Sequence, residues 1–159
     1  MSSTVVILFL DFDGVLHPAG CHTDRHFCEL PRFENLMRQY PDVRIVISSA
    51  WQEAFPLPAL RALFSADLAA RIIGRTLTAD TDGDAKNRHQ QIWQYLGKAG
   101  ATSARWIALD DAQTQFPRRC PQLVVCDPAR GFDELAAERL VQRLNALNVP
   151  RVEPRREAA

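Results

Sequence analysis

The sequence has no long apolar run, no excess charge of either sign and almost no lysine. Its formal net charge is zero over 159 residues, so it lacks the overall attraction to nucleic acid or anionic membranes that a strongly basic chain has. The N-terminal apolar run Thr4–Leu10 has only seven residues, too short for a signal peptide or a membrane-spanning helix. We therefore expect a cytoplasmic protein without membrane association.

Cys-x-x-Cys pairs, internal repeats and low-complexity linkers are also absent. The four cysteines are Cys21, Cys28, Cys120 and Cys126, and in the cytoplasm we expect them to be reduced. The basic residues comprise 17 arginines and two lysines. Arginine suits bidentate phosphate binding, although a general preference of the genome for arginine is the simpler explanation. We expect a single domain over residues 1–150 and a flexible C-terminal tail over 151–159.

The chain alternates predicted strands and helices. The predicted strands are Thr4–Leu10, Val43–Ile47, Arg71–Gly74, Arg105–Leu109 and Gln122–Cys126. The predicted helices are Pro31–Tyr40, Pro58–Ala70, Asp84–Leu96 and Phe132–Leu147, with a loop over Thr78–Asp84. Apolar residues at helical spacing give the last three helices the inward faces Leu60/Leu63/Phe64/Leu68, Ile92/Trp93/Leu96 and Leu135/Leu140/Leu144/Leu147. This order predicts a three-layer α/β fold, a parallel sheet with helices on both faces.

The most informative motif is Asp11-Phe12-Asp13-Gly14, directly after the first apolar run. Its two carboxylates lie two residues apart at the end of a strand, where their like charges repel each other. A divalent cation relieves that repulsion, so the motif indicates a metal-assisted site with Asp11 as nucleophile and Asp13 as proton donor. Gly14 permits a tight turn beside a ligand. The alternative, in which the two acids only cap a turn or a helix, accounts for less of the pattern.

Polar residues also follow two other predicted strands. Ser48 and Ser49 come after the second strand, and Asp110 and Asp111 come after the fourth. Because ligands bind at the carboxyl ends of parallel strands, we expect these residues to meet Asp11. Taken alone, the serine pair is equally typical of a helix N-cap, and the two roles are compatible.

This set of residues predicts phosphoryl transfer. Attack by Asp11 on a phosphoryl group would form an aspartyl-phosphate, while Asp13 would protonate the leaving oxygen and later activate water. Mg²⁺ would bind the Asp11 carboxylate, the backbone carbonyl of Asp13 and a carboxylate from Asp110 or Asp111.

Phosphate binding would also need a hydroxyl group and a cation. The Ser48 hydroxyl and the neighbouring backbone at Ser49 and Gly14 are the candidates to contact the phosphate. Arg88 and Lys86, both at the start of one predicted helix, are the candidates to neutralise it. The sequence does not choose between these two cations, and an ordinary surface arginine is a further possibility for Arg88.

The motifs resemble those of the haloacid dehalogenase (HAD) superfamily of phosphohydrolases. They comprise Asp-x-Asp-Gly after an apolar strand (Asp11–Gly14), a strand ending in serine (Ile45–Ser48) and a strand ending in the acids Asp110-Asp111. The resemblance implies a Rossmann-like, HAD-like sheet and a Mg²⁺-dependent phosphatase. It also favours Asp111 over Asp110 as the metal ligand.

More narrowly, four segments look like the small HAD domains of multi-domain RNA repair proteins. These segments are Leu8–His17, Ile45–Trp51, Arg88–Trp93 and Ala108–Asp111. The superfamily usually carries lysine in its third motif, and in this subgroup Arg88 stands in that place.

The resemblance further implies a capless protein. In the superfamily a cap module commonly enters after the first motif or between the second and the third. Here His17–Glu29 is too short for a folded cap, and Trp51–Ala85 is largely filled by one predicted helix and loops. We therefore expect an open site, suited to bulky or macromolecular phosphate esters.

Two other features near the motifs admit more than one interpretation. His17, Cys21, His22, His26 and Cys28 form a small cluster, but it has no typical zinc-ligand spacing. Solvated histidines, or histidines lining the substrate entrance, explain it better than zinc does. The indole of Trp51 could stack on a base, although a core tryptophan is the more usual role.

The sequence thus supports a Mg²⁺-dependent phosphatase acting on a phosphorylated small molecule. A phosphatase for nucleic-acid ends is the nearest alternative, and a non-catalytic phosphate-sensing domain is the alternative from another class. The sequence does not indicate the oligomeric state.

Overall fold

The computed structural model describes residues 5–76 and 85–154 as one α/β unit. Its five strands are β1 (Val6–Leu10), β2 (Val43–Ile47), β3 (Ile72–Arg75), β4 (Arg105–Asp110) and β5 (Leu123–Val125). All neighbouring strands are parallel, in the order β3-β2-β1-β4-β5. The predicted parallel sheet is confirmed, and the predicted loop Thr78–Asp84 lies outside the described residues.

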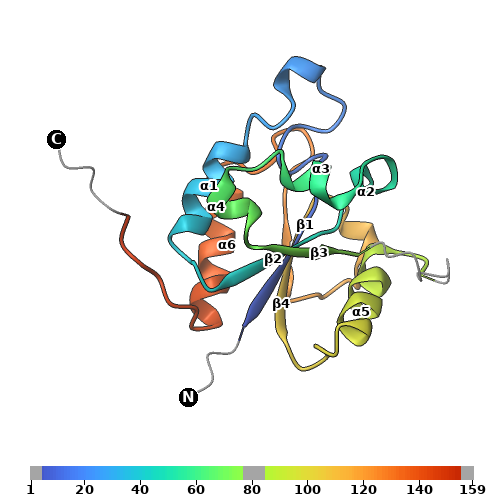
Figure 1. Ribbon diagram of the computed structural model, residues 1–159, viewed down its shortest axis with the longest axis vertical. Coiled ribbons are helices and arrows are strands. Elements are labelled where there is room, and N and C mark those ends of the chain that lie inside the picture. The colour runs from blue at the N-terminus through green and yellow to red at the C-terminus, as the bar shows by residue number, and fades with distance from the viewer. Residues whose placement is uncertain (1–4, 77–84, 155–159) are drawn as a thin grey trace.

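The sheet is covered by helices on both faces, as Figure 1 shows. The helices are α1 (Leu30–Arg38), α2 (Trp51–Ala54), α3 (Leu57–Arg61), α4 (Ala66–Ala69), α5 (Arg88–Lys98) and α6 (Glu134–Ala146). Two 3₁₀ turns, η1 (Thr23–Arg25) and η2 (Gln113–Gln115), lie in connecting loops. The HAD-like, Rossmann-like core expected from the sequence is therefore present.

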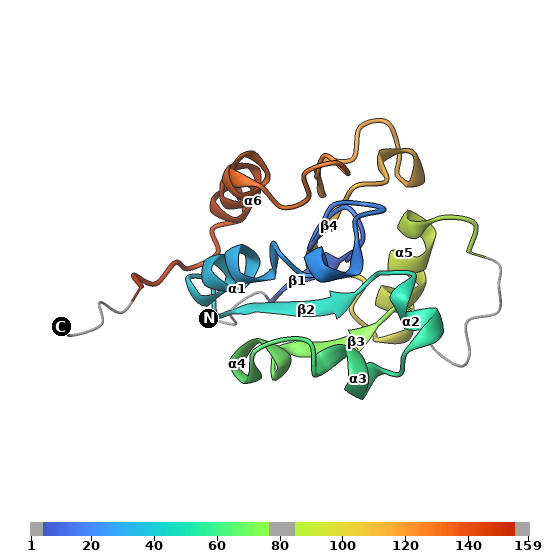
Figure 2. The ribbon, with the colours of Figure 1, turned by 90° about the horizontal axis from the view of Figure 1, so that it is seen from above.

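The larger of two apolar cores lies between the sheet and α1, α4 and α6. Alternate residues of β1, such as Leu8 and Leu10, point into it, as the two-residue period of a strand requires. The Phe33 and Phe132 rings pack edge to face here, and the Tyr40 hydroxyl donates a hydrogen bond to Asn145 at 3.2 Å. Figures 1 and 2 both place α1 beside α6, in agreement with these contacts.

The smaller core lies on the opposite face, under α5. Ile7 and Phe9 of β1 point into it, where they meet Ile92 and Leu96 of α5. The Phe9 ring also packs edge to face against Trp106 of β4. Both faces of β1 are thus buried, which explains why its sequence is continuously apolar.

The predicted helix Pro58–Ala70 is wrong, because the chain forms two short helices there, α3 and α4. Ser65 separates them in an extended conformation. Its backbone N–H and its hydroxyl each donate a hydrogen bond of 2.8 Å to the carboxylate of Glu34. A continuous helix would need that N–H for its own backbone, so the buried carboxylate of α1 favours the break.

Three residues assigned to inward faces are instead exposed. Leu63, Trp93 and Leu135 have exposed fractions of 38%, 43% and 52%. Leu63 lies in the break between the two short helices. Trp93 and Leu135 are each one position away from the buried stripe of their helix, and a step of one residue turns a side chain about 100° around the helix axis.

Within the part of the chain that the structure describes, little structure lies outside this core. In residues 5–76 and 85–154 no cap module covers the sheet edge, and no helix there is long and apolar enough to cross a membrane. Beyond Pro150, the Val152 N–H donates a hydrogen bond to the Gln39 carbonyl at 2.8 Å, and the Arg151 guanidinium donates to the Gln39 side chain.

Candidate active site

The strand register aligns three polar residues in a row at one edge of the sheet. Leu10 is paired with Ile47 on one side and with Leu109 on the other. The next residue of each strand is therefore at the same level, which brings Asp11, Ser48 and Asp110 together. The Asp11 N–H donates to the Leu109 carbonyl at 3.1 Å, and the Ser48 N–H donates to the Leu10 carbonyl at 2.8 Å.

Three carboxylates converge at this edge. Asp11, Asp110 and Asp111 each offer a carboxylate oxygen within 4.8 Å of the others. Asp11 and Asp110 are each only 2% exposed. Burial, followed by repulsion from Asp110, raises the pKa of Asp11 to about 9, even though Arg88 opposes the shift. Burial also raises the pKa of Asp110.

This group of acids fits a divalent cation. Carboxylate oxygens are the ligands that Mg²⁺ prefers in proteins, and a cation would relieve the repulsion that raises the Asp11 pKa. Among the described residues, these three aspartates are the group of potential ligand side chains that lie close enough together to hold a metal.

Arg88, the first residue of α5, neutralises part of this negative charge. Its Nη1 lies 3.2 Å from Asp11 Oδ1 and 2.9 Å from Asp110 Oδ2, and it donates to the Ser48 carbonyl at 2.5 Å. Burial alone would lower the Arg88 pKa, but the two carboxylates outweigh it and the pKa is raised. The guanidinium therefore stays charged inside the site.

Lys86, the other candidate cation, lies outside this group. It is exposed, and its backbone N–H donates to the side chain of Gln90. Within the part of the chain that the structure describes, no ion pair joins Lys86 to the acids. The geometry brings Arg88 and not Lys86 to the candidate nucleophile.

Ser48 and Ser49 are both buried beside the acids, but their hydroxyl groups differ. The Ser49 hydroxyl accepts a hydrogen bond from the Trp51 N–H at 3.3 Å, at the start of α2. The buried Ser48 hydroxyl has no hydrogen-bond partner. A buried polar group without a partner is costly, and a ligand oxygen would satisfy it.

The backbone conformation and the close neighbours at position 14 require glycine. Its φ of +75° is in the left-handed region, and a Cβ there would lie 2.1 Å from Asp111 Oδ2. The glycine therefore leaves room for the Asp111 carboxylate, a steric reason that the motif alone does not reveal.

Asp13 lies at the open side of the site, with its side chain 51% exposed. His17 Nε2 is 2.6 Å from Asp13 Oδ1, and Trp51 Nε1 donates to Asp13 Oδ2 at 3.1 Å. Sequence reasoning assigned neither contact. One feature of the sequence could have predicted the first contact. His17 comes four residues after Asp13, and a tight turn between them brings such a residue back toward Asp13.

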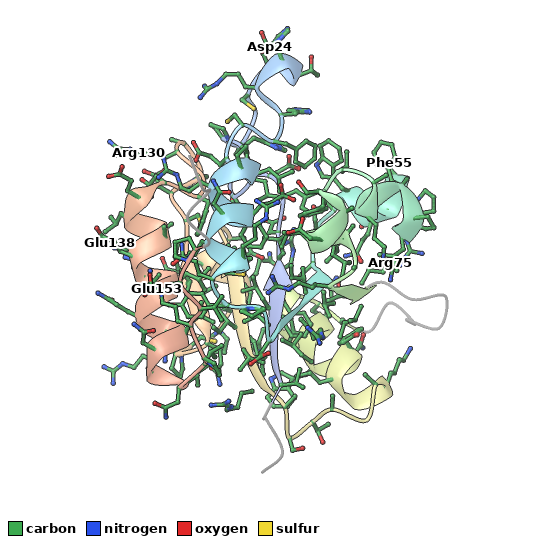
Figure 3. The ribbon with its side chains drawn as sticks, turned by 60° about the vertical axis from the view of Figure 1, so that its left-hand side comes forward. Asp24, Phe55, Arg75, Arg130, Glu138 and Glu153 are labelled. Atoms are coloured by element: carbon green, nitrogen blue, oxygen red, sulfur yellow. The ribbon has the colours of Figure 1, made fainter. Side chains whose placement is uncertain are left out.

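The His/Cys cluster is divided between two surroundings. The His17 and His26 rings stack 4.5 Å apart beside Asp13, whereas His22 is exposed and pairs with Asp24. Figure 3 shows Asp24 at the outer end of this loop. Trp51 is half-buried and packs against the larger core, and its ring stacks against Phe55, 5.6 Å away.

The searches of curated proteins and of solved structures found no match. The family described as the HAD domain in Swiss Army Knife RNA repair proteins matches residues 7–137. This range includes β2 to β5, all of β1 except Val6, and the entire group of aspartates, serines and Arg88 described above. The chain therefore belongs to the family of HAD domains found in Swiss Army Knife RNA repair proteins.

Proposed function

We propose that this protein is a Mg²⁺-dependent phosphohydrolase that cleaves phosphate monoesters through a phosphorylated Asp11. The observation that carries the proposal is the convergence of Asp11, Asp110 and Asp111 within 4.8 Å. A half-buried arginine and an unpartnered buried hydroxyl adjoin them. Family membership supports phosphohydrolase chemistry on this fold.

In the first step an Asp11 oxygen attacks phosphorus. A bond forms between that oxygen and phosphorus, the bond from phosphorus to the leaving oxygen breaks, and Asp13 gives its proton to the leaving oxygen. In the second step Asp13 takes a proton from water, the water oxygen attacks phosphorus, and the bond to Asp11 breaks. Phosphate leaves, and both aspartates return to their starting states.

The remaining residues provide charge and hydrogen bonds. Mg²⁺ would be held by the carboxylates of Asp11 and Asp111 and the carbonyl of Asp13, with Asp110 beside them, and would neutralise negative charge on the phosphoryl group. Arg88 adds a fixed positive charge next to Asp11. Ser48 donates its free hydroxyl to a phosphate oxygen, with the backbone of Ser49 and Gly14 close by.

The test is hydrolysis of an aryl phosphate in Mg²⁺, compared between wild type and Asp11→Asn. We expect turnover by the wild type and none by the variant. Asp24→Asn, an exposed aspartate in the neighbouring loop, is the matched control and should behave as wild type. Turnover by Asp11→Asn would contradict the nucleophile assignment. Phosphate binding by well-folded, Mg²⁺-loaded wild type without turnover would favour the phosphate-sensing alternative.

A narrower candidate function is the removal of phosphate from nucleic-acid ends. It is favoured by the aromatic pair Trp51 and Phe55, whose rings stack at an interplanar angle of 26°. Trp51 also contacts Asp13, and Phe55 is 46% exposed at the periphery of α2 (Figure 3). Exposed aromatic rings beside a phosphate site can stack on a terminal base, and the family description names RNA repair.

This narrower function is tested by competition between substrates. Turnover of 3′- and 5′-phosphorylated oligonucleotides should exceed that of sugar phosphates and nucleotide monophosphates. Phe55→Ala should lose this preference while keeping its rate on an aryl phosphate. Equal turnover of all substrates by the wild type would leave the general phosphatase as the better description.

A further inference from the structure

We infer that His17 and Trp51 are positioning residues that together fix the Asp13 carboxylate for proton transfer to the leaving group. The inference rests on the proposed function, because it concerns how Asp13 performs that role. It adds two residues that the motifs of the sequence do not assign to the reaction. The geometry around Asp13 carries it.

The hydrogen bonds of His17 define which ring nitrogen holds the proton. The Phe27 backbone N–H donates to His17 Nδ1 at 3.1 Å, so Nδ1 is the acceptor and carries no proton. In a neutral imidazole the proton is then on Nε2. The contact of 2.6 Å between Nε2 and Asp13 Oδ1 is therefore a hydrogen bond donated by His17.

Trp51 holds the other oxygen of the same carboxylate. An indole N–H can only donate, and Trp51 Nε1 lies 3.1 Å from Asp13 Oδ2. Each carboxylate oxygen thus accepts one hydrogen bond from a ring of the protein. Two donors in different directions fix the rotation of the carboxylate about its last bond, which a single donor would leave free.

The surrounding loop is built to hold these two donors. The His17 side chain is only 1% exposed and is covered by the stacked ring of His26. Phe27 adopts a φ of 64°, an uncommon and costly conformation for a residue other than glycine, and in this conformation its N–H reaches His17. Its ring packs edge to face against Trp51. Strain of this kind persists where the neighbouring structure enforces it.

The arrangement also explains how an exposed side chain is oriented in an open site. Asp13 is half-exposed, and a free carboxylate there would populate several rotamers. Among residues 5–76 and 85–154 no cap module lies over Asp13, so its orientation must come from this domain. Buried His17 and half-buried Trp51 supply it.

The inference predicts a dependence on the leaving group. A general acid typically contributes a rate factor of about 10² to 10⁴, and it matters most for alkyl phosphates, whose leaving oxygen is strongly basic. For 4-nitrophenyl phosphate the leaving oxygen is weakly basic and needs little protonation. Loss of Asp13 orientation should therefore slow alkyl phosphate hydrolysis much more than aryl phosphate hydrolysis.

The experiment measures kcat and KM for 4-nitrophenyl phosphate and for glycerol phosphate in wild type, His17→Phe, His17→Gln and Trp51→Phe. We expect His17→Phe and Trp51→Phe to lose roughly 10-fold to 100-fold in kcat/KM on glycerol phosphate, with a much smaller loss on the aryl ester, because kcat/KM reports the first step, in which the leaving group departs. The amide of His17→Gln can still donate to Asp13, so this variant should recover part of the loss. His22→Gln, an exposed histidine of the same loop, is the matched control.

Equal losses on both substrates would place the defect outside protonation of the leaving group and would overturn the inference. If His17→Phe does not fold, Trp51→Phe, which keeps an aromatic ring beside Phe12 and Phe27, decides the question. The ¹⁵N spectrum of wild-type histidines tests the hydrogen bonds independently of activity, because it reports which nitrogen of His17 is protonated. A wild type that hydrolyses neither substrate would refute the proposed function and the leaving-group role, whereas a proton on Nδ1 would refute the His17 assignment alone.

Discussion

Replacing the candidate nucleophile should make the metal-free protein more stable. In the unfolded chain Asp11 releases its proton near its ordinary pKa of 3.8, whereas in the folded protein the pKa is about 9 because of burial and the neighbouring Asp110. Between these two values the folded state binds more protons than the unfolded state. The stability of the wild type therefore falls as the pH rises through this range. The asparagine side chain of the Asp11→Asn variant is uncharged in both the folded and the unfolded state, so the variant does not lose stability in this way as the pH rises.

The magnitude follows from the pKa. Each pH unit between the unfolded-state pKa of 3.8 and the pH of the experiment costs the folded protein about 1.4 kcal/mol of stability. At pH 7 the loss is therefore at most about 4 kcal/mol. The proton is shared among three neighbouring carboxylates, so we expect Asp11→Asn to gain about 2 to 4 kcal/mol at pH 7 and less at pH 5. For a chain of this length such a gain raises Tm by roughly 5 to 15 °C. The Phe12 N–H, which donates to Asp11 Oδ1 at 2.8 Å, can bond equally to the asparagine oxygen.

The assay is urea and thermal unfolding in EDTA at pH 5, 7 and 9, for wild type, Asp11→Asn and Asp24→Asn. The advantage of Asp11→Asn should grow with pH, while the exposed control stays within about 0.5 kcal/mol of wild type. An Asp11→Asn protein that is no more stable than wild type at pH 9 would refute the reasoning, because the buried charge would then cost nothing. Added Mg²⁺ should narrow the difference, since it stabilises only the protein that keeps its ligand.

Three other predictions follow from the same structure. Mg²⁺ should raise the Tm of the wild type with the logarithm of its concentration once this exceeds Kd, and this rise should disappear in Asp111→Asn, as scanning calorimetry would show. Arg88→Ala should lower kcat on an aryl phosphate by about 10² to 10³, whereas Lys86→Ala should keep it, and equal losses would argue against the assignment of Arg88. Glu34→Ala should lower the free energy of unfolding by about 1 to 3 kcal/mol, because the Ser65 N–H that bonds to Glu34 loses its buried partner. Urea unfolding would check this value.

The sheet and the acidic residues could be predicted because they depend on local patterns. The apolar runs identified all five strands to within one or two residues, and parallel pairing then placed Asp11, Ser48 and Asp110 at one edge. The two short helices α3 and α4 could not be predicted in this way. Their separation depends on Glu34, a residue 31 positions earlier in the chain, and helical periodicity carries no information about such a contact.

The residues that contact the acids also could not be predicted from local sequence patterns. Arg88 and Lys86 precede or begin the same helix, two residues apart, so composition and spacing treat them alike. The point at which α5 begins decides between them. Asn87 caps the helix by accepting a hydrogen bond from the Gln90 N–H at 2.9 Å, which makes Arg88 the first helical residue and leaves Lys86 exposed before the cap.

The two carboxylates of the Asp11–Gly14 motif depend on supporting residues that the motif itself does not reveal. Asp11 and Asp13 are two residues apart, yet Asp11 is 2% exposed and Asp13 has a side chain that is 51% exposed. Asp11 is held by strand pairing and faces half-buried Arg88, whereas Asp13 follows the end of the strand and forms an isolated bridge with His17. The burial that surrounds Asp11, the proposed nucleophile, is thus unavailable to Asp13. An exposed proton donor needs side-chain hydrogen bonds in place of the strand, and in this chain His17 and Trp51 are the residues that provide them.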